Sequence, residues 1–253
     1  MTNREKYKFD DFTLANYERL VTMAIEKGFK FISYTAEFVD ERKDILWRHD
    51  VEFEPDVALK MAEIEHKYGV KATYFFQIHS HYYNIFDNHY TEVFHKIHAL
   101  GHDVGLHFDS HYYGINDETQ LNKYIELDRA YFEVVLGVKI DSYSFHNTTP
   151  FTQSCLKPKY GGLINVYSSH FKEKYNYCGD SLGYWRFDRL EDVLNDGSIQ
   201  HLQVLTHDAN WTEEVLSPRK RVRKFVGDKA ERMYNGQVYG LINKGMLCPD
   251  DEE

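Results

Sequence analysis

Apolar positions along the chain follow two alternating rhythms, one typical of helices and one typical of buried strands. Between Leu14 and Ala24 they recur three and four residues apart, with Thr13 and Gly28 as capping residues at the two ends. The same pattern predicts further helices at about 55–68, 90–100, 118–136 and 190–194, and another that starts at Ser217-Pro218. Short apolar runs predict strands at about 29–32, 45–50, 71–76, 103–107, 141–146, 163–168 and 199–206.

This alternation of strands and helices indicates a parallel sheet or barrel. The chain has 253 residues, enough for one α/β barrel, and it shows no repeat, low-complexity tract or linker. We therefore expect a single domain over residues 1–253.

His107 and His111 form a candidate metal site immediately after the predicted strand 103–107. Their HxxxH spacing allows two imidazoles to approach one ion, and imidazole nitrogen suits zinc. A third ligand is needed, because three protein ligands and an open position are typical of catalytic zinc.

Four predicted strands end in histidine or aspartate, at His49-Asp50, His107, His146 and His207-Asp208. A parallel barrel carries its chemistry at the carboxyl ends of its strands. These side chains are therefore candidates for one polar site, with Asp50 as the nearest third ligand.

Charge narrows the range of partners. The chain has 30 basic and 40 acidic residues, a formal net charge of −10, which argues against nucleic-acid and anionic-membrane surfaces. One basic run, at residues 219–224, is predicted to be a solvated helix face.

The cysteines and the N-terminal residues indicate the compartment. Cys155, Cys178 and Cys248 are far apart and lack CxxC spacing, so neither a disulfide framework nor a thiolate zinc site is indicated. The sequence begins with charged residues and contains no apolar run of spanning length. We expect a cytoplasmic location, and the oligomeric state stays open.

Three motifs carry a resemblance to a known family. RHDVE at 48–52, GHDVGLHFDSHYY at 101–113 and LTH at 205–207 resemble successive motifs of the polysaccharide deacetylase family, also called NodB-homology or carbohydrate esterase 4. The likeness covers about residues 45–211 and is strongest with a divergent branch whose first motif is Arg-His-Asp-Val-Asp.

The resemblance implies a distorted (β/α)7 barrel that removes acetyl groups from N-acetylated sugars. It implies a divalent ion, most simply zinc, held by Asp50, His107 and His111. It also implies that His207, in the LTH motif, protonates the leaving amine. The implied function is a metal-dependent hydrolase of C–N bonds in amides.

The sequence departs from the family at the general base. The family's paired aspartates align with His49-Asp50, so the base is His49 unless Glu52, on the same strand face as Asp50, takes the role. Thr148 stands where the family has an arginine that orients the base, which leaves that contact missing or supplied by His146 or Asn147.

Substrate contacts are expected from aromatic and polar residues after the strands. The candidates are His146, Asn147, Trp185, Arg186 and Tyr112. If the location is cytoplasmic, the natural substrate is a precursor sugar of surface-polysaccharide metabolism.

Two other functions are compatible with the sequence. His79 and His81 form an HxH pair after another strand, which fits a different metal-dependent barrel amidohydrolase. Alternatively, the replaced base and arginine fit an inactive carbohydrate-binding scaffold.

Overall fold

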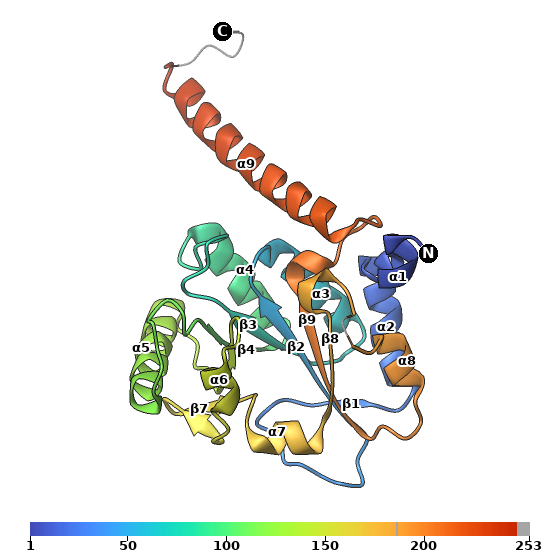
Figure 1. Cartoon of the computed structure of the whole chain (residues 1–253). Helices are drawn as coiled ribbons and strands as arrows, with labels where there is room; N and C mark the ends of the chain where they lie inside the picture. Colours follow the sequence, from blue (N-terminus) through green and yellow to red (C-terminus); the bar gives the residue numbers. More distant parts are fainter. Residues whose placement is uncertain (186, 247–253) are drawn as a thin grey trace.

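A single curved sheet organises the molecule (Figure 1). The structure, a computed structural model, describes residues 1–185 and 187–246. Its nine strands follow the order β6-β7-β5-β4-β3-β2-β9-β8, with β1 paired to β2, and every strand pair except β6–β7 is parallel.

Seven of the strands are arranged as in a barrel. They are β2 (Asp44–Val51), β3 (Thr73–Phe76), β4 (Asp103–Phe108), β5 (Ser142–Phe145), β7 (Leu163–Asn165), β8 (Asn176–Gly179) and β9 (His201–His207). Each is paired to the next one in this series except between β7 and β8, and β9 returns to pair with β2. This is an open, distorted (β/α)7 barrel, and the predicted fold class is confirmed.

Helices connect these strands and pack around the sheet (Figure 1). They are α3 (Pro55–Lys67), α4 (Asn88–Ala99), α5 (Glu118–Leu136), α6 (Pro150–Ser154), α7 (Ser169–Lys174) and α8 (Leu190–Asn195), with α1 (Asn3–Tyr7) and α2 (Leu14–Glu26) before the barrel and α9 (Pro218–Asn243) after it. Two short strands complete the sheet, β1 (Lys30–Phe31) and β6 (Lys159–Tyr160).

Strand β2 shows how the sequence separates the outer layer from the interior. Trp47 and Val51 face outward and belong to the main core between sheet and helices. Leu46 faces inward and packs in a second cluster with Phe75 of β3. Since side chains alternate along a strand, Asp50 lies on the inner face with Leu46, and the next inner position beyond it is Glu52.

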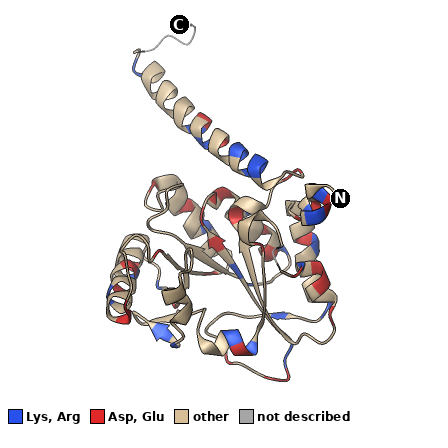
Figure 2. Cartoon of the chain, viewed as in Figure 1, with Lys and Arg blue, Asp and Glu red and all other residues tan. Residues whose placement is uncertain are grey.

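Helix α9 extends from the barrel mouth away from the body (Figure 1). Its first turns contact the body, where Arg221 and Phe225 are buried, while Arg219, Arg223 and Lys224 are exposed. Basic residues gather in these first turns (Figure 2). Among the described residues, no helix combines the length and apolar character needed to cross a membrane.

Candidate metal centre and catalytic residues at the barrel mouth

Glu52, His107 and His146 converge at the carboxyl end of the barrel. Oε1 of Glu52 lies 2.8 Å from Nε2 of His107 and 2.7 Å from Nδ1 of His146, and these two ring nitrogens are 3.2 Å apart. The three residues come from the ends of β2, β4 and β5. In the described part of the chain, this is the one group of three such ligands whose donor atoms all lie within 4.8 Å of one another.

The hydrogen-bond pattern around His107 suits a cation at this group. Ser144 Oγ donates to Oδ1 of Asp50 at 3.0 Å, so it accepts from Nδ1 of His107 at 2.7 Å. Nε2 of a neutral His107 then carries a lone pair, which faces the Glu52 carboxylate. Two acceptors in contact require a proton or a metal ion between them. Two imidazoles and one carboxylate are also a known catalytic zinc ligand set, with a fourth position open.

Electrostatics keep Glu52 ionised. Burial alone would raise the pKa of the Glu52 carboxyl, but the contacts with His107 and His146 and the charge of His207 hold that pKa well below its usual range. Burial likewise opposes protonation of His146, yet the contact with Glu52 raises its pKa. The carboxylate is therefore available as an anionic ligand at neutral pH.

Asp50 precedes Glu52 by two residues on the inner face of β2, further inside the barrel, and it is buried. Besides the bond from Ser144, its Oδ2 lies 3.8 Å from an Nη of Arg48 and 3.9 Å from Nδ1 of His107. Arg48 is buried as well, donates to the Tyr167 hydroxyl at 3.0 Å, and has its Nε and Nη1 without hydrogen-bond partners. Asp50 is thus its nearest counter-charge within the barrel.

His207 is anchored by Asp180, a residue that the sequence analysis did not single out by itself. His207 Nδ1 lies 2.6 Å from Oδ1 of Asp180, and the indole N–H of Trp211 donates to Oδ2 at 3.0 Å. Asp180 follows β8, a strand that the periodicity missed because its four residues alternate weakly. An aspartate directly after a short strand was the signal in the sequence that could have identified Asp180.

Asp208 shapes the segment that carries Glu52. Its carboxylate accepts from the backbone N–H groups of Glu52 (3.3 Å), Phe53 (3.0 Å) and Glu54. It is fully buried, and burial raises its pKa although these bonds act in the opposite direction. Asp208 is therefore a structural support for the site.

The structure brings the predicted ligand set Asp50, His107 and His111 together only in part. His107 belongs to the metal-capable group. His111 is exposed in the turn after β4, where its Nε2 lies 2.7 Å from the carbonyl oxygen of Asn147. His146, predicted as a substrate contact, lies in the group instead, and its Nε2 lies 2.8 Å from Nδ2 of Asn147.

His49 lies away from the mouth, on the outer face of β2. Its ring is fully buried, stacked on Tyr74 at 4.1 Å, and its Nε2 lies 2.9 Å from Oε1 of Glu65. Strand β2 continues to Val51, so alternation turns His49 and Asp50 to opposite faces. Of the two predicted base candidates, only Glu52 reaches the mouth.

The HxH pair does not assemble a ligand group in the described residues. His79 Nε2 lies 3.0 Å from the Tyr113 hydroxyl and 3.4 Å from Asp128, while His81 is exposed. The ring of His79 stacks on Tyr112, at the rim.

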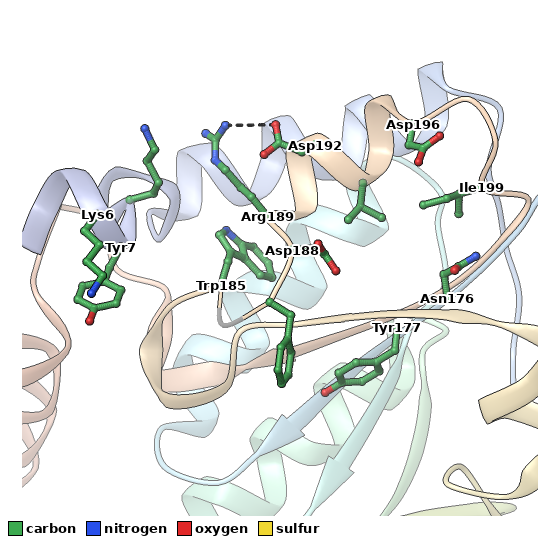
Figure 3. Close-up of a pocket in the computed structure, with 13 residues that line it drawn as sticks. Lys6, Tyr7, Asn176, Tyr177, Trp185, Asp188, Arg189, Asp192, Asp196 and Ile199 are labelled. Atoms are coloured by element: carbon green, nitrogen blue, oxygen red, sulfur yellow. Dashed lines mark ion pairs between the residues drawn. The ribbon is translucent and has the colours of Figure 1, made fainter.

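Trp185 lies elsewhere, in a hollow of about 630 Å³ between α1, β8 and α8 (Figure 3). The predicted Arg186 lies outside the described residues. Figure 3 also shows the ion pair between Arg189 and Asp192 at the edge of this hollow. None of its lining residues belongs to the metal-capable group, so the chemistry is assigned to the barrel mouth. The lining is Lys6, Tyr7, Lys8, Asn176, Tyr177, Trp185, Phe187, Asp188, Arg189, Asp192, Val193, Asp196 and Ile199.

The sequence matches no protein-family model and no curated protein. Its backbone is similar to a family 4 carbohydrate esterase from Bacillus anthracis, with 15% identity, a TM-score of 0.45, and 83% of this chain and 84% of that chain covered. It is also similar to the catalytic domain of a peptidoglycan N-acetylglucosamine deacetylase from Eubacterium rectale, with 19% identity, a TM-score of 0.46, and 77% and 90% covered. A third similar structure is a CE4 family pseudoenzyme from Bacillus anthracis, with 14% identity, a TM-score of 0.41, and 77% and 63% covered.

Proposed function

We propose that this protein is a metal-dependent hydrolase that removes an N-acetyl or related acyl group from a sugar. The observation that carries the proposal is the convergence of Glu52, His107 and His146 at the mouth of a parallel barrel, with Asp50 and His207 on the same inner face. Amide hydrolysis needs a Lewis acid for the carbonyl, a base for water and an acid for the leaving nitrogen, and this mouth offers a candidate for each.

Glu52, His107 and His146 would hold the ion, with zinc the best match to two imidazoles and a carboxylate. A divalent ion held there supplies Lewis acidity, which polarises an amide carbonyl and makes water easier to deprotonate. Ser144 fixes the tautomer of His107 by accepting from Nδ1 at 2.7 Å, which leaves Nε2 for the ion.

Asp50 is the proposed general base, in place of His49. It is the carboxylate next to the ligand group on the inner face of β2, and its Oδ2 lies 3.8 Å from the Arg48 guanidinium. With Glu52 assigned to the ion, Asp50 is the remaining carboxylate at the carboxyl end of this strand.

His207 is the proposed general acid. Its pKa is raised to about 10, because the attraction of Asp180, Glu52 and Asp50 outweighs the cost of burial. A cationic imidazole can give a proton to a leaving amine, which is a poor leaving group without one. Asp180 holds the ring by Nδ1, so Nε2 is the nitrogen available for transfer.

The proposed substrate class, an N-acetylated sugar, comes from the likeness of the RHDVE, GHDVGLHFDSHYY and LTH motifs to deacetylase motifs. The similar structures include an N-acetylglucosamine deacetylase, which is consistent with this choice. A precursor in surface-polysaccharide metabolism is our proposal for its physiological form.

Acetate release from N-acetylhexosamine oligomers and from nucleotide- and lipid-linked forms tests the function, with zinc-loaded and chelated protein side by side. Asp50→Asn should keep the ion but lose about 10²- to 10⁴-fold in turnover, the usual effect of removing a general base. Ser144→Ala is the matched control, because it separates a base at Asp50 from a residue that only orients His107.

Equal losses in Asp50→Asn and Ser144→Ala would reject Asp50 as the base. His207→Gln should slow amide hydrolysis more than hydrolysis of an activated acetate ester, whose leaving group does not need protonation. No acetate release by the zinc-loaded protein, from any of these substrates, would reject the hydrolase and favour a carbohydrate-binding scaffold.

A further inference from the structure

The side chain of Tyr112 is largely exposed, yet its ring is fixed by stacking on a neighbouring imidazole. Tyr112 is 62% exposed, and its ring stacks on the imidazole of His79 with centroids 3.7 Å apart and planes 5° from parallel. Because His79 covers one face of the ring, the exposed surface of Tyr112 belongs to its other face and its edge.

His79 is itself fixed by residues behind it. Its Nε2 lies 3.0 Å from the hydroxyl of Tyr113 and 3.4 Å from Oδ1 of Asp128, a carboxylate that is 2% exposed. Tyr113 donates to Asp128, meets Tyr112 edge-on at 4.9 Å and stacks on Tyr124 at 4.2 Å. The Tyr112 ring therefore rests on a support that reaches into the protein interior.

The backbone of this turn is constrained as well. Oδ1 of Asp109 accepts from the backbone N–H of His111 at 2.9 Å and from that of Tyr112 at 3.4 Å. A ring that is already ordered loses little conformational entropy when a ligand packs on it, so this arrangement favours binding.

The turn that carries Tyr112 contacts the segment that carries His146. His111, the neighbour of Tyr112 in the chain, contacts the carbonyl oxygen of Asn147 at 2.7 Å, and Nδ2 of Asn147 lies 2.8 Å from Nε2 of His146. Tyr112 therefore belongs to the same rim as the ligand group, at the junction of the segments that follow β4 and β5.

We infer that Tyr112, supported by His79, is a stacking platform for a pyranose ring of the substrate. The C–H-bearing face of a pyranose is flat and apolar and packs well on an aromatic ring, while its hydroxyl groups stay in water. The inference rests on the proposed function for the acyl group, but the sugar contact itself can be tested without turnover. It also gives a role to His79 that needs no metal.

The binding test uses chelated protein, so that no hydrolysis occurs, and a tetramer of N-acetylglucosamine as the probe. Saturation-transfer NMR and calorimetry give the affinity for wild type, Tyr112→Ala, Tyr112→Phe and His79→Ala. Tyr112→Ala should weaken binding about tenfold, in line with the energy of an aromatic contact. Tyr112→Phe keeps the ring and should bind like wild type, and His79→Ala should bind more weakly than wild type because the platform loses its support.

Tyr131→Ala is the matched control, since Tyr131 is 57% exposed on α5 and makes none of these contacts. It should bind the tetramer like wild type. An equal loss in Tyr112→Ala and Tyr131→Ala, or no loss in Tyr112→Ala, would overturn the inference.

A second measurement uses zinc-loaded protein and compares kcat/KM for the tetramer with that for N-acetylethanolamine, an amide without a ring. The ratio of the two should fall about tenfold in Tyr112→Ala. An unchanged ratio would overturn the platform. If no substrate is turned over, the hydrolase proposal fails, while the binding result still decides the platform.

Discussion

His207 Nδ1 lies 2.6 Å from Oδ1 of Asp180, and the two form a largely buried ion pair at the end of the barrel. Burial opposes the charge on His207, but the attraction of Asp180 and two further carboxylates raises its pKa to about 10. The pair links the end of β9 to the residue after β8. Loss of the charge on His207 would therefore remove the proposed proton donor and also weaken a contact between these two strands.

The pH dependence of stability tests this pair in chelated protein. A folded-state pKa of about 10 against the ordinary 6.5 means that the pair stabilises the fold fully below about pH 6.5 and loses its contribution between about 6.5 and 10. The free energy of unfolding, from urea titrations, should fall over this window by up to about 5 kcal/mol more in wild type than in His207→Gln. Parallel curves for the two proteins would contradict the raised pKa.

We expect His49 to stabilise the fold and not to take part in catalysis. It is fully buried, and Asn at this position removes the imidazole that lies 2.9 Å from the buried carboxylate of Glu65. His49→Asn should lower the free energy of unfolding by about 3 kcal/mol, as expected when a buried pair is broken. Its turnover per zinc-loaded folded molecule should stay within about threefold of wild type, far from the effect of losing a base. A hundredfold loss with the ion retained would return the base to His49.

The sequence predicted the barrel because each of its strong elements has a clear local signal. Residues 118–136 form α5 with the predicted bounds, since Asp117 caps its first turn and Gly137 ends it at a φ of 68°. The strand at 45–50 was predicted from the apolar run that leads into the RHDVE motif, and the observed β2 is buried along its whole length.

The grouping of Glu52, His107 and His146 was harder to predict, because it depends on which way loops turn after the strands end. HxxxH spacing brings two imidazoles to one face on a helical turn, whereas His107 lies in a strand and His111 in the turn that follows. The alternation of side chains along β2 correctly predicted that Glu52 lies on the same face as Asp50. His146 comes close to His107 because β4 pairs with β5, and no local sequence pattern predicts that pairing.

Gly105 of β4 should not tolerate a side chain. A Cβ there would lie 2.6 Å from the ring of Phe75 and 2.7 Å from the carbonyl oxygen of Ser142, inside the barrel below the site. Gly105→Ala should lower the free energy of unfolding by about 1–3 kcal/mol, the usual cost of overpacking. Gly236→Ala is the control, because a Cβ on that exposed part of α9 meets nothing within 4 Å, and it should leave stability unchanged or slightly higher. Equal free energies of unfolding for the two variants would contradict this prediction, because they would show that the barrel interior can accommodate a methyl group at position 105.

The metal ligands can be identified by elemental analysis of purified variants. Wild type should carry about one divalent ion per chain, and Glu52→Gln, His107→Ala and His146→Ala should each lose most of it, because each removes one of only three protein ligands. His111→Ala and His79→Ala should keep the ion, since His111 contacts the Asn147 carbonyl and His79 supports Tyr112. Loss of the ion in His111→Ala with retention in His146→Ala would restore the HxxxH pair as ligands, and loss confined to His79→Ala would place the ion at the HxH pair. Circular dichroism on each variant separates loss of a ligand from loss of the fold.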